Sequence, residues 1–114
     1  MSDKIAEIKS HIEGVINKAY QKAAAEGLLP AGAVLTGTVE IPRDKTNGDY
    51  AANHAMTGAR ALRSAPKKIA DTLVANMELA SDKYLTSAEV AGPGFINFRI
   101  SHKWYEDVIR DINQ

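Results

Sequence analysis

The segment with the clearest recognition chemistry is Gly94-Phe95-Ile96-Asn97-Phe98-Arg99-Ile100-Ser101. A β-strand turns successive side chains to opposite faces, so one face of this segment is wholly apolar and belongs to a core: Ile96, Phe98 and Ile100. The other face carries Phe95, Asn97 and Arg99, spaced about 7 Å apart. A ring, an amide and a fixed cation in one row are typical of surfaces that bind single-stranded or looped RNA, because they stack on a base, read its edge and meet a phosphate. The alternative is that Phe95 lies under a C-terminal helix, Asn97 bonds a backbone group and Arg99 is solvated.

Catalytic patterns are missing from the sequence. It contains no phosphate-binding loop, no dinucleotide fingerprint and no His-Glu-x-x-His, and it has no cysteine. The three histidines, His11, His54 and His102, are far apart, and we expect them on the surfaces of three different helices. Asp44 and Asp49 are expected to make local turn bonds rather than to act as an acid–base pair. We therefore expect no catalytic residue, metal or cofactor in this chain.

Charge is balanced overall but not locally. The chain has 14 basic and 14 acidic residues, yet residues 43–68 carry six basic side chains against two acidic ones. Four of them are candidate contacts to an RNA backbone: Arg60, Arg63, Lys67 and Lys68. A solvated helix face would produce the same cluster.

Hydrophobic spacing predicts the elements that must position these residues. An apolar stripe predicts a helix over residues 2–25, ended by Gly27, and alternation predicts a strand over residues 33–41. A loop through residue 48 precedes a helix that begins near Asp49 or Tyr50, and a further helix is capped by Ser64 with Pro66 in its first turn. Strands over residues 84–90 and 94–101 flank the turn at residues 91–94, and Ser101 caps a final helix.

This order, α-β-α-α-β-β-α, predicts an α+β fold in which a small antiparallel sheet packs against about four helices. With 114 residues, 45% of them hydrophobic and 25% charged, we expect residues 1–114 to form a single soluble domain. The longest uncharged stretch, residues 27–39, is too short for a membrane span and is broken by Pro30. A cytoplasmic location without membrane contact is the expectation.

Three stretches resemble the N-terminal domain of arginyl-tRNA synthetase. The first runs from Pro42 to Gly48-Asp49-Tyr50-Ala51-Ala52-Asn53-His54-Ala55, although Ala52 stands where the family usually has Thr or Ser. The second is Arg63-Ser64-Ala65-Pro66-Lys67-Lys68-Ile69-Ala70, and the third is Val90-Ala91-Gly92-Pro93-Gly94-Phe95-Ile96-Asn97-Phe98. The three occur in order and cover nearly the whole chain.

The motif residues have expected structural tasks. Gly48 allows a tight turn that starts the second helix, Asp49 accepts from that helix's first N–H groups, and Tyr50 and Asn53 tie the turn to the sheet. A second turn, made by Gly92, Pro93 and Gly94, presents Phe95 at the start of its strand.

The resemblance also implies a function. In the family, the positions of Phe95 and Asn97 contact a nucleotide of the tRNA D-loop at the elbow, and Arg99 continues the same row. The parent would be an arginine–tRNA ligase that uses ATP and Mg²⁺. We expect its catalytic and anticodon-binding domains to be absent from this chain, whose partners would then be tRNA and the catalytic domain. Two alternatives stay open: a free-standing RNA-binding module, and a structural domain that only docks on a catalytic partner.

Overall fold

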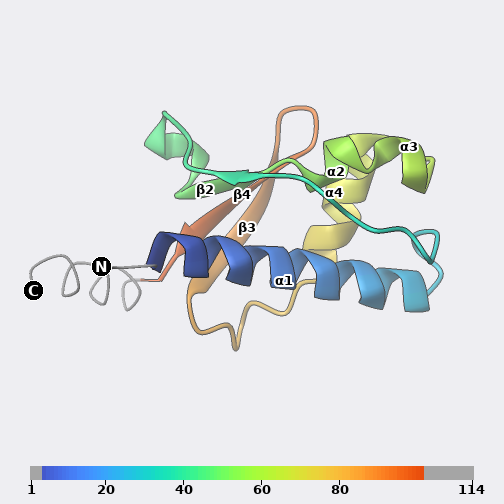
Figure 1. The fold of residues 1–114 in the computed structure, drawn as a ribbon, viewed down its shortest axis with the longest axis horizontal. Helices are drawn as coiled ribbons and strands as arrows, with labels where there is room; N and C mark the ends of the chain where they lie inside the picture. Colours follow the sequence, from blue (N-terminus) through green and yellow to red (C-terminus); the bar gives the residue numbers. More distant parts are fainter. Residues whose placement is uncertain (1–3, 102–114) are drawn as a thin grey trace, which may run out of the picture.

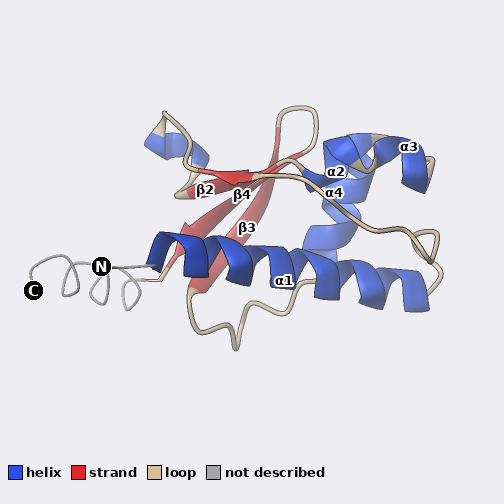
Figure 2. Cartoon of the chain, viewed as in Figure 1, coloured by secondary structure: helices blue, strands red, loops and turns tan. Residues whose placement is uncertain are grey.

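Residues 4–101 are described by a computed structural model, in which helices pack against a four-stranded sheet (Figure 1). The elements, coloured by type in Figure 2, are in order α1 (Lys4–Ala25), β1 (Val39–Glu40), the 3₁₀ turn η1 (Lys45–Asn47), β2 (Tyr50–Ala52), α2 (His54–Thr57), α3 (Ala59–Leu62), α4 (Pro66–Ala75), β3 (Leu85–Ala91) and β4 (Phe95–Ile100). Within this part of the chain no helix has the length and apolar character needed to cross a bilayer.

The long helix α1 follows from its apolar stripe. The residues it buries recur every three or four positions: Ile8, Ile12, Ile16, Ala19, Tyr20 and Ala23. It ends as predicted at Gly27, whose φ of +79° lets the N–H groups of Gly27 and Leu28 reach the carbonyls of Ala24 and Ala23. Ile5, in the first turn of the helix, is 53% exposed and lies outside this buried stripe.

The sheet has the strand order β1-β2-β4-β3, and every neighbouring pair is antiparallel. Its inner face carries Val39, Tyr50, Ala52, Ile96 and Phe98, all buried in one core with the helices. This arrangement confirms the predicted α+β class with its small antiparallel sheet. The register also places Ala51 directly opposite Asn97 on the other face, which determines the geometry of the site below.

The prediction of a helix from Asp49 or Tyr50 onward is wrong at its start. Residues Tyr50–Ala52 form β2, and two short helices, α2 and α3, follow it. The alanines of this segment favour a helix locally, but Tyr50 pairs with Phe98 on β4, a contact between residues distant in sequence that overrides local propensity.

Two smaller predictions also differ, and a third is not tested. The strand expected over residues 33–41 is reduced to β1, because the N–H and C=O of Thr38 bond Asn53 instead of a neighbouring strand. The expected cap Ser64 is replaced by Ala65, which lies in the extended region preferred before a proline and makes no side-chain cap. The final helix expected after Ser101 lies outside the described residues.

Candidate nucleic-acid interface

The predicted row on β4 faces outward. Phe95 is 39% exposed, Asn97 is half-buried and Arg99 is exposed, whereas Ile96 and Phe98 are fully buried. This confirms the predicted alternation of faces. The Arg99 guanidinium donates to the Thr46 carbonyl at 3.2 Å, so it is anchored rather than only solvated. The Asn97 amide has no hydrogen-bond partner within residues 4–101, which leaves its donors and acceptor available to a ligand.

A groove of about 720 Å³ runs beside this row and is called here the outer groove. It lies between the 38–47 segment and the 91–93 turn, and its lining is Thr38, Glu40, Ile41, Pro42, Arg43, Asn47, Ala51, Asn53, Ala91, Gly92, Pro93, Phe95 and Asn97. The lining combines an exposed ring, three asparagine amides and one arginine, so it can hold a planar ligand that presents hydrogen-bonding groups at its edge.

The turn at Gly48 holds the loop side of this site against β4. Gly48 has a φ of +91°, and a Cβ there would lie 2.9 Å from the Phe98 carbonyl oxygen, so glycine is required. Asp49 was expected to cap the following helix, and that prediction is wrong. Its carboxylate accepts instead from the Ile100 N–H at 2.8 Å, and its own N–H donates to the Phe98 carbonyl at 2.8 Å. The turn therefore ties the loop to β4.

Asn53 bonds the residue that precedes β1, and Tyr50 lies within β2 itself. The Asn53 side-chain oxygen accepts from the Thr38 N–H at 2.8 Å, while Tyr50 is buried in β2 beneath the groove. Burial raises the pKa of the Tyr50 hydroxyl, and the charge of neighbouring Asp49 adds to that shift. Gly37 packs close to Asn53, since a Cβ there would lie 2.6 Å from its side-chain oxygen.

The turn between β3 and β4 is formed by the predicted Gly92-Pro93-Gly94. The Gly94 N–H donates to the Ala91 carbonyl at 3.2 Å, and both glycines have positive φ. A Cβ on Gly94 would lie 2.8 Å from the Cβ of Pro66, so the turn sits directly on the first residue of α4. This contact puts the turn that precedes Phe95 next to the N-terminus of α4.

The basic residues predicted for RNA contact lie on α3, directly after it, and in the first turn of α4, and not in the outer groove. Arg60, Arg63, Lys67 and Lys68 are all exposed. Lys67 lies 3.9 Å from Asp71, whereas the other three form no ion pair with a described residue. None of the four lines the outer groove; the contact described for this end of α4 is that of Pro66 with the turn at Gly94.

The sequence interpretation missed the loop side of the site. Glu40, Arg43 and Asn47 line the groove, although all three were assigned to a strand end or a loop without a role. They come beside Asn97 only when β1 pairs with β2 and β2 pairs with β4, and these pairings join residues distant in sequence.

Comparison with known proteins agrees with this architecture. The family model described as the arginyl tRNA synthetase N terminal domain matches residues 6–100. The chain belongs to this family. It is 38% identical over all 114 residues to an arginine–tRNA ligase of Acetivibrio thermocellus, of which it covers 20%. It is 49% identical over 86 residues to an arginine–tRNA ligase of a Ruegeria species, of which it covers 14%.

Solved structures show the same fold. The arginyl-tRNA synthetase of Plasmodium falciparum superposes with a TM-score of 0.66 at 17% identity, over 88% of this chain and 17% of that one. The Thermus thermophilus enzyme gives a TM-score of 0.64 at 23% identity, over 90% of this chain and 15% of that one. The chain thus spans about one-fifth of the length of the curated relatives it matches.

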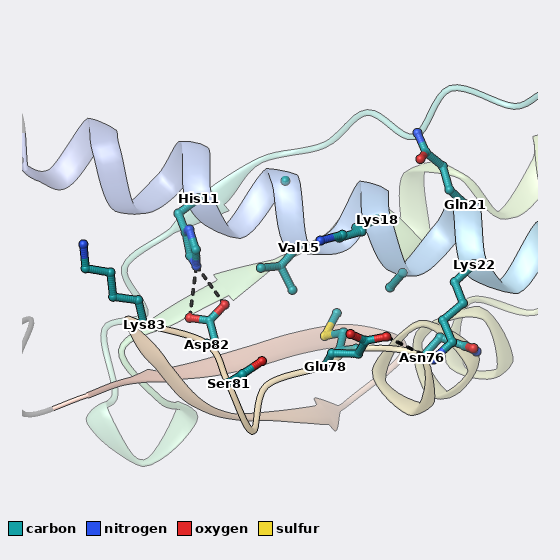
Figure 3. Close-up of a pocket in the computed structure, with 13 residues that line it drawn as sticks. His11, Val15, Lys18, Gln21, Lys22, Asn76, Glu78, Ser81, Asp82 and Lys83 are labelled. Carbon is teal, nitrogen blue, oxygen red and sulfur yellow. Dashed lines mark hydrogen bonds and ion pairs between the residues drawn. The ribbon is translucent and has the colours of Figure 1, made fainter.

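This synthetase domain has a second hollow, of about 740 Å³, between α1 and residues 76–83 (Figure 3). Two side-chain pairs cross it: His11 with Asp82 at 2.9 Å and Lys22 with Glu78 at 3.4 Å. Although burial opposes its ionisation, the N–H groups of Leu85 and Tyr84 and the His11 ring hold the pKa of Asp82 below its usual range. These pairs fasten α1 to the segment that leads into β3.

The histidine prediction is wrong for His54. This residue is fully buried, its Nε2 bonds the Glu13 carboxylate on α1, and its Nδ1 has no hydrogen-bond partner among residues 4–101. The short helix α2 buries His54 and Ala55 together, so the ring is part of the core and joins α2 to α1. His11 is half-buried in its pair with Asp82, and His102 lies outside the part of the chain that the structure describes.

Proposed function

We propose that this domain supplies an arginine–tRNA ligase with its contact to the D-loop at the tRNA elbow, through Phe95 and Asn97. The observation that carries the proposal is that Phe95 and Asn97 line one groove, with the Phe95 ring exposed and the Asn97 amide without a hydrogen-bond partner among residues 4–101. A base would stack on Phe95, and Asn97 would hydrogen-bond its edge.

The charge distribution supports contact with a base over a purely electrostatic contact. The chain is neutral overall, so few phosphate counterions can be released on binding and little sequence-independent affinity is available. Arg99, and with lower weight Arg60, Arg63, Lys67 and Lys68, would meet the phosphates that flank the bound loop.

Within this proposal the whole ligase joins arginine to its tRNA with ATP and Mg²⁺, in the cytoplasm. ATP and Mg²⁺ would bind to the catalytic domain of that ligase. The catalytic domain would be the protein partner of the present domain. This domain contributes binding energy toward tRNA and takes no part in arginine activation.

The test is aminoacylation kinetics of the full-length ligase with Phe95→Ala and Asn97→Ala. Losing a base–aromatic stack costs roughly 1–3 kcal/mol, which is about five- to a hundred-fold in kcat/KM for tRNA. Arginine-dependent pyrophosphate exchange should stay nearly unchanged in both variants. The control is Phe98→Ala, which removes a fully buried ring and should cost about 3–5 kcal/mol of stability.

The alternatives predict different results. If Phe95→Ala and Asn97→Ala lower the melting temperature as much as Phe98→Ala does, and charging by the folded enzyme is unchanged, the domain only docks on its partner. If the coding sequence carries no synthetase body after Gln114, a free-standing RNA-binding module replaces the ligase assignment.

A further inference from the structure

Two exposed carboxylates share the outer face of the sheet with Asn97. The strand register places Ala51 opposite Asn97 and Glu40 opposite Ala51, while Glu89 lies opposite Asn97 on its other side. Both glutamates are exposed, and neither makes a hydrogen bond or ion pair with a residue of the described chain. A row of carboxylate, methyl, amide and carboxylate therefore crosses the four strands.

The two carboxylates differ in one respect that matters for binding. Glu40 lines the outer groove together with Ala51 and Asn97, whereas Glu89 does not. Glu40 and Asn97 lie two strands apart, about 10 Å in the hydrogen-bonding direction. The small Ala51 side chain lies between them in the row and lines the groove as well.

This arrangement restricts what can be bound over Ala51. An ionised carboxylate only accepts hydrogen bonds, while an asparagine amide both donates and accepts. A phosphate carries acceptors and negative charge, so Glu40 repels it. A nucleotide that presents an N–H or O–H donor on the side away from Asn97 is bound by both groups at once.

We infer that Glu40 is a specificity-determining residue, whose carboxylate accepts from a base N–H or ribose hydroxyl of the nucleotide held by Asn97. The inference rests on the proposed function, since it names what the same groove selects. Arg43 lines the groove three residues beyond Glu40. Its guanidinium provides a binding position for the phosphate of that nucleotide, separate from the Glu40 carboxylate. Glu40 thereby fixes the orientation of the nucleotide in the groove.

The test compares Glu40→Gln with Glu89→Gln in the 114-residue chain, measuring the affinity for a fluorescein-labelled tRNA transcript by anisotropy. Both substitutions remove one exposed negative charge from the same face, so any general charge effect is shared. Because a hydrogen bond to a charged group is stronger than a neutral one, Glu40→Gln should weaken binding roughly tenfold. Glu89→Gln should leave the affinity unchanged or slightly increased. Each affinity is scaled to the folded fraction measured by circular dichroism.

The sign of the effect separates the possible roles. If Glu40→Gln tightens binding and steepens its salt dependence, or if the two variants change together, Glu40 acts by repulsion alone and the inference is overturned. A transcript with 2′-deoxy nucleotides in the bound loop identifies the donor: a ribose hydroxyl if the Glu40→Gln penalty disappears, and a base N–H if the penalty persists. The proposed function fails on separate evidence, namely if the unsubstituted chain does not bind tRNA or if Asn97→Ala binds equally well.

Discussion

Gly48→Ala is expected to destabilise the domain strongly, although it adds only one methyl group. Gly48 has a φ of +91°, and the added Cβ would lie 2.9 Å from the Phe98 carbonyl oxygen. Because that oxygen belongs to the backbone of a paired strand, it cannot rotate away. The left-handed conformation costs about 1–2 kcal/mol for alanine. The Asp49 N–H donates to the same oxygen at 2.8 Å. Losing that hydrogen bond would destabilise the fold by about 1 kcal/mol more.

These terms add to about 2–3 kcal/mol. For a chain of 114 residues the entropy of unfolding is about 0.24 kcal/mol/K, so the melting temperature should fall by roughly 8–13 °C. Thermal unfolding followed by circular dichroism measures this directly. The matched control is Gly14→Ala on α1, where an added Cβ meets no atom within 4 Å, and alanine should stabilise the helix by about 0.5–1 kcal/mol. A melting temperature for Gly48→Ala equal to that of the unsubstituted chain would refute the close approach of the turn to β4.

Two further predictions concern pH and salt. Asp82 has a lowered pKa in the folded state, so its contribution to stability is present above the unfolded pKa of about 3.9 and is lost as pH falls through the folded value. Asp82→Asn should therefore lower the melting temperature at pH 7 but much less near pH 3, and a difference that does not change with pH would contradict this. For the 114-residue chain we expect weak tRNA binding that declines as salt is raised. Tight binding that persists at high salt in filter-binding assays would show that phosphate contacts have been misjudged.

Local signals in the sequence were sufficient for part of the fold. The isoleucine spacing of α1 and its stop at Gly27 depend on neighbours within a few residues. The alternation along β4 likewise needs only the apolar character of Ile96 and Phe98 to assign Phe95 and Asn97 to the outer face. These features were predicted because each is determined within its own element.

The remaining features depend on contacts between distant residues. Tyr50 is in a strand because it pairs with Phe98. His54 is buried where its ring nitrogen forms a hydrogen bond with the Glu13 carboxylate on α1. Glu40 enters the groove only when β1 pairs with β2 and β2 pairs with β4. Nothing within a few residues of these positions carries that information, so spacing and propensity could not supply it.

The order β1-β2-β4-β3 has a consequence for how the domain reaches its native state. β4 is the last described strand along the chain, yet it lies in the interior of the sheet and pairs with both β2 and β3. Until β4 is synthesised, β1 and β2 have no sheet to join, and the apolar side of α1 has only part of its partner surface. Nearly half the chain separates Tyr50 from Phe98, so closing that pairing should limit the folding rate. During translation the nascent chain would therefore expose its core residues, and with them a risk of aggregation, until the strand that carries Phe95 and Asn97 is in place.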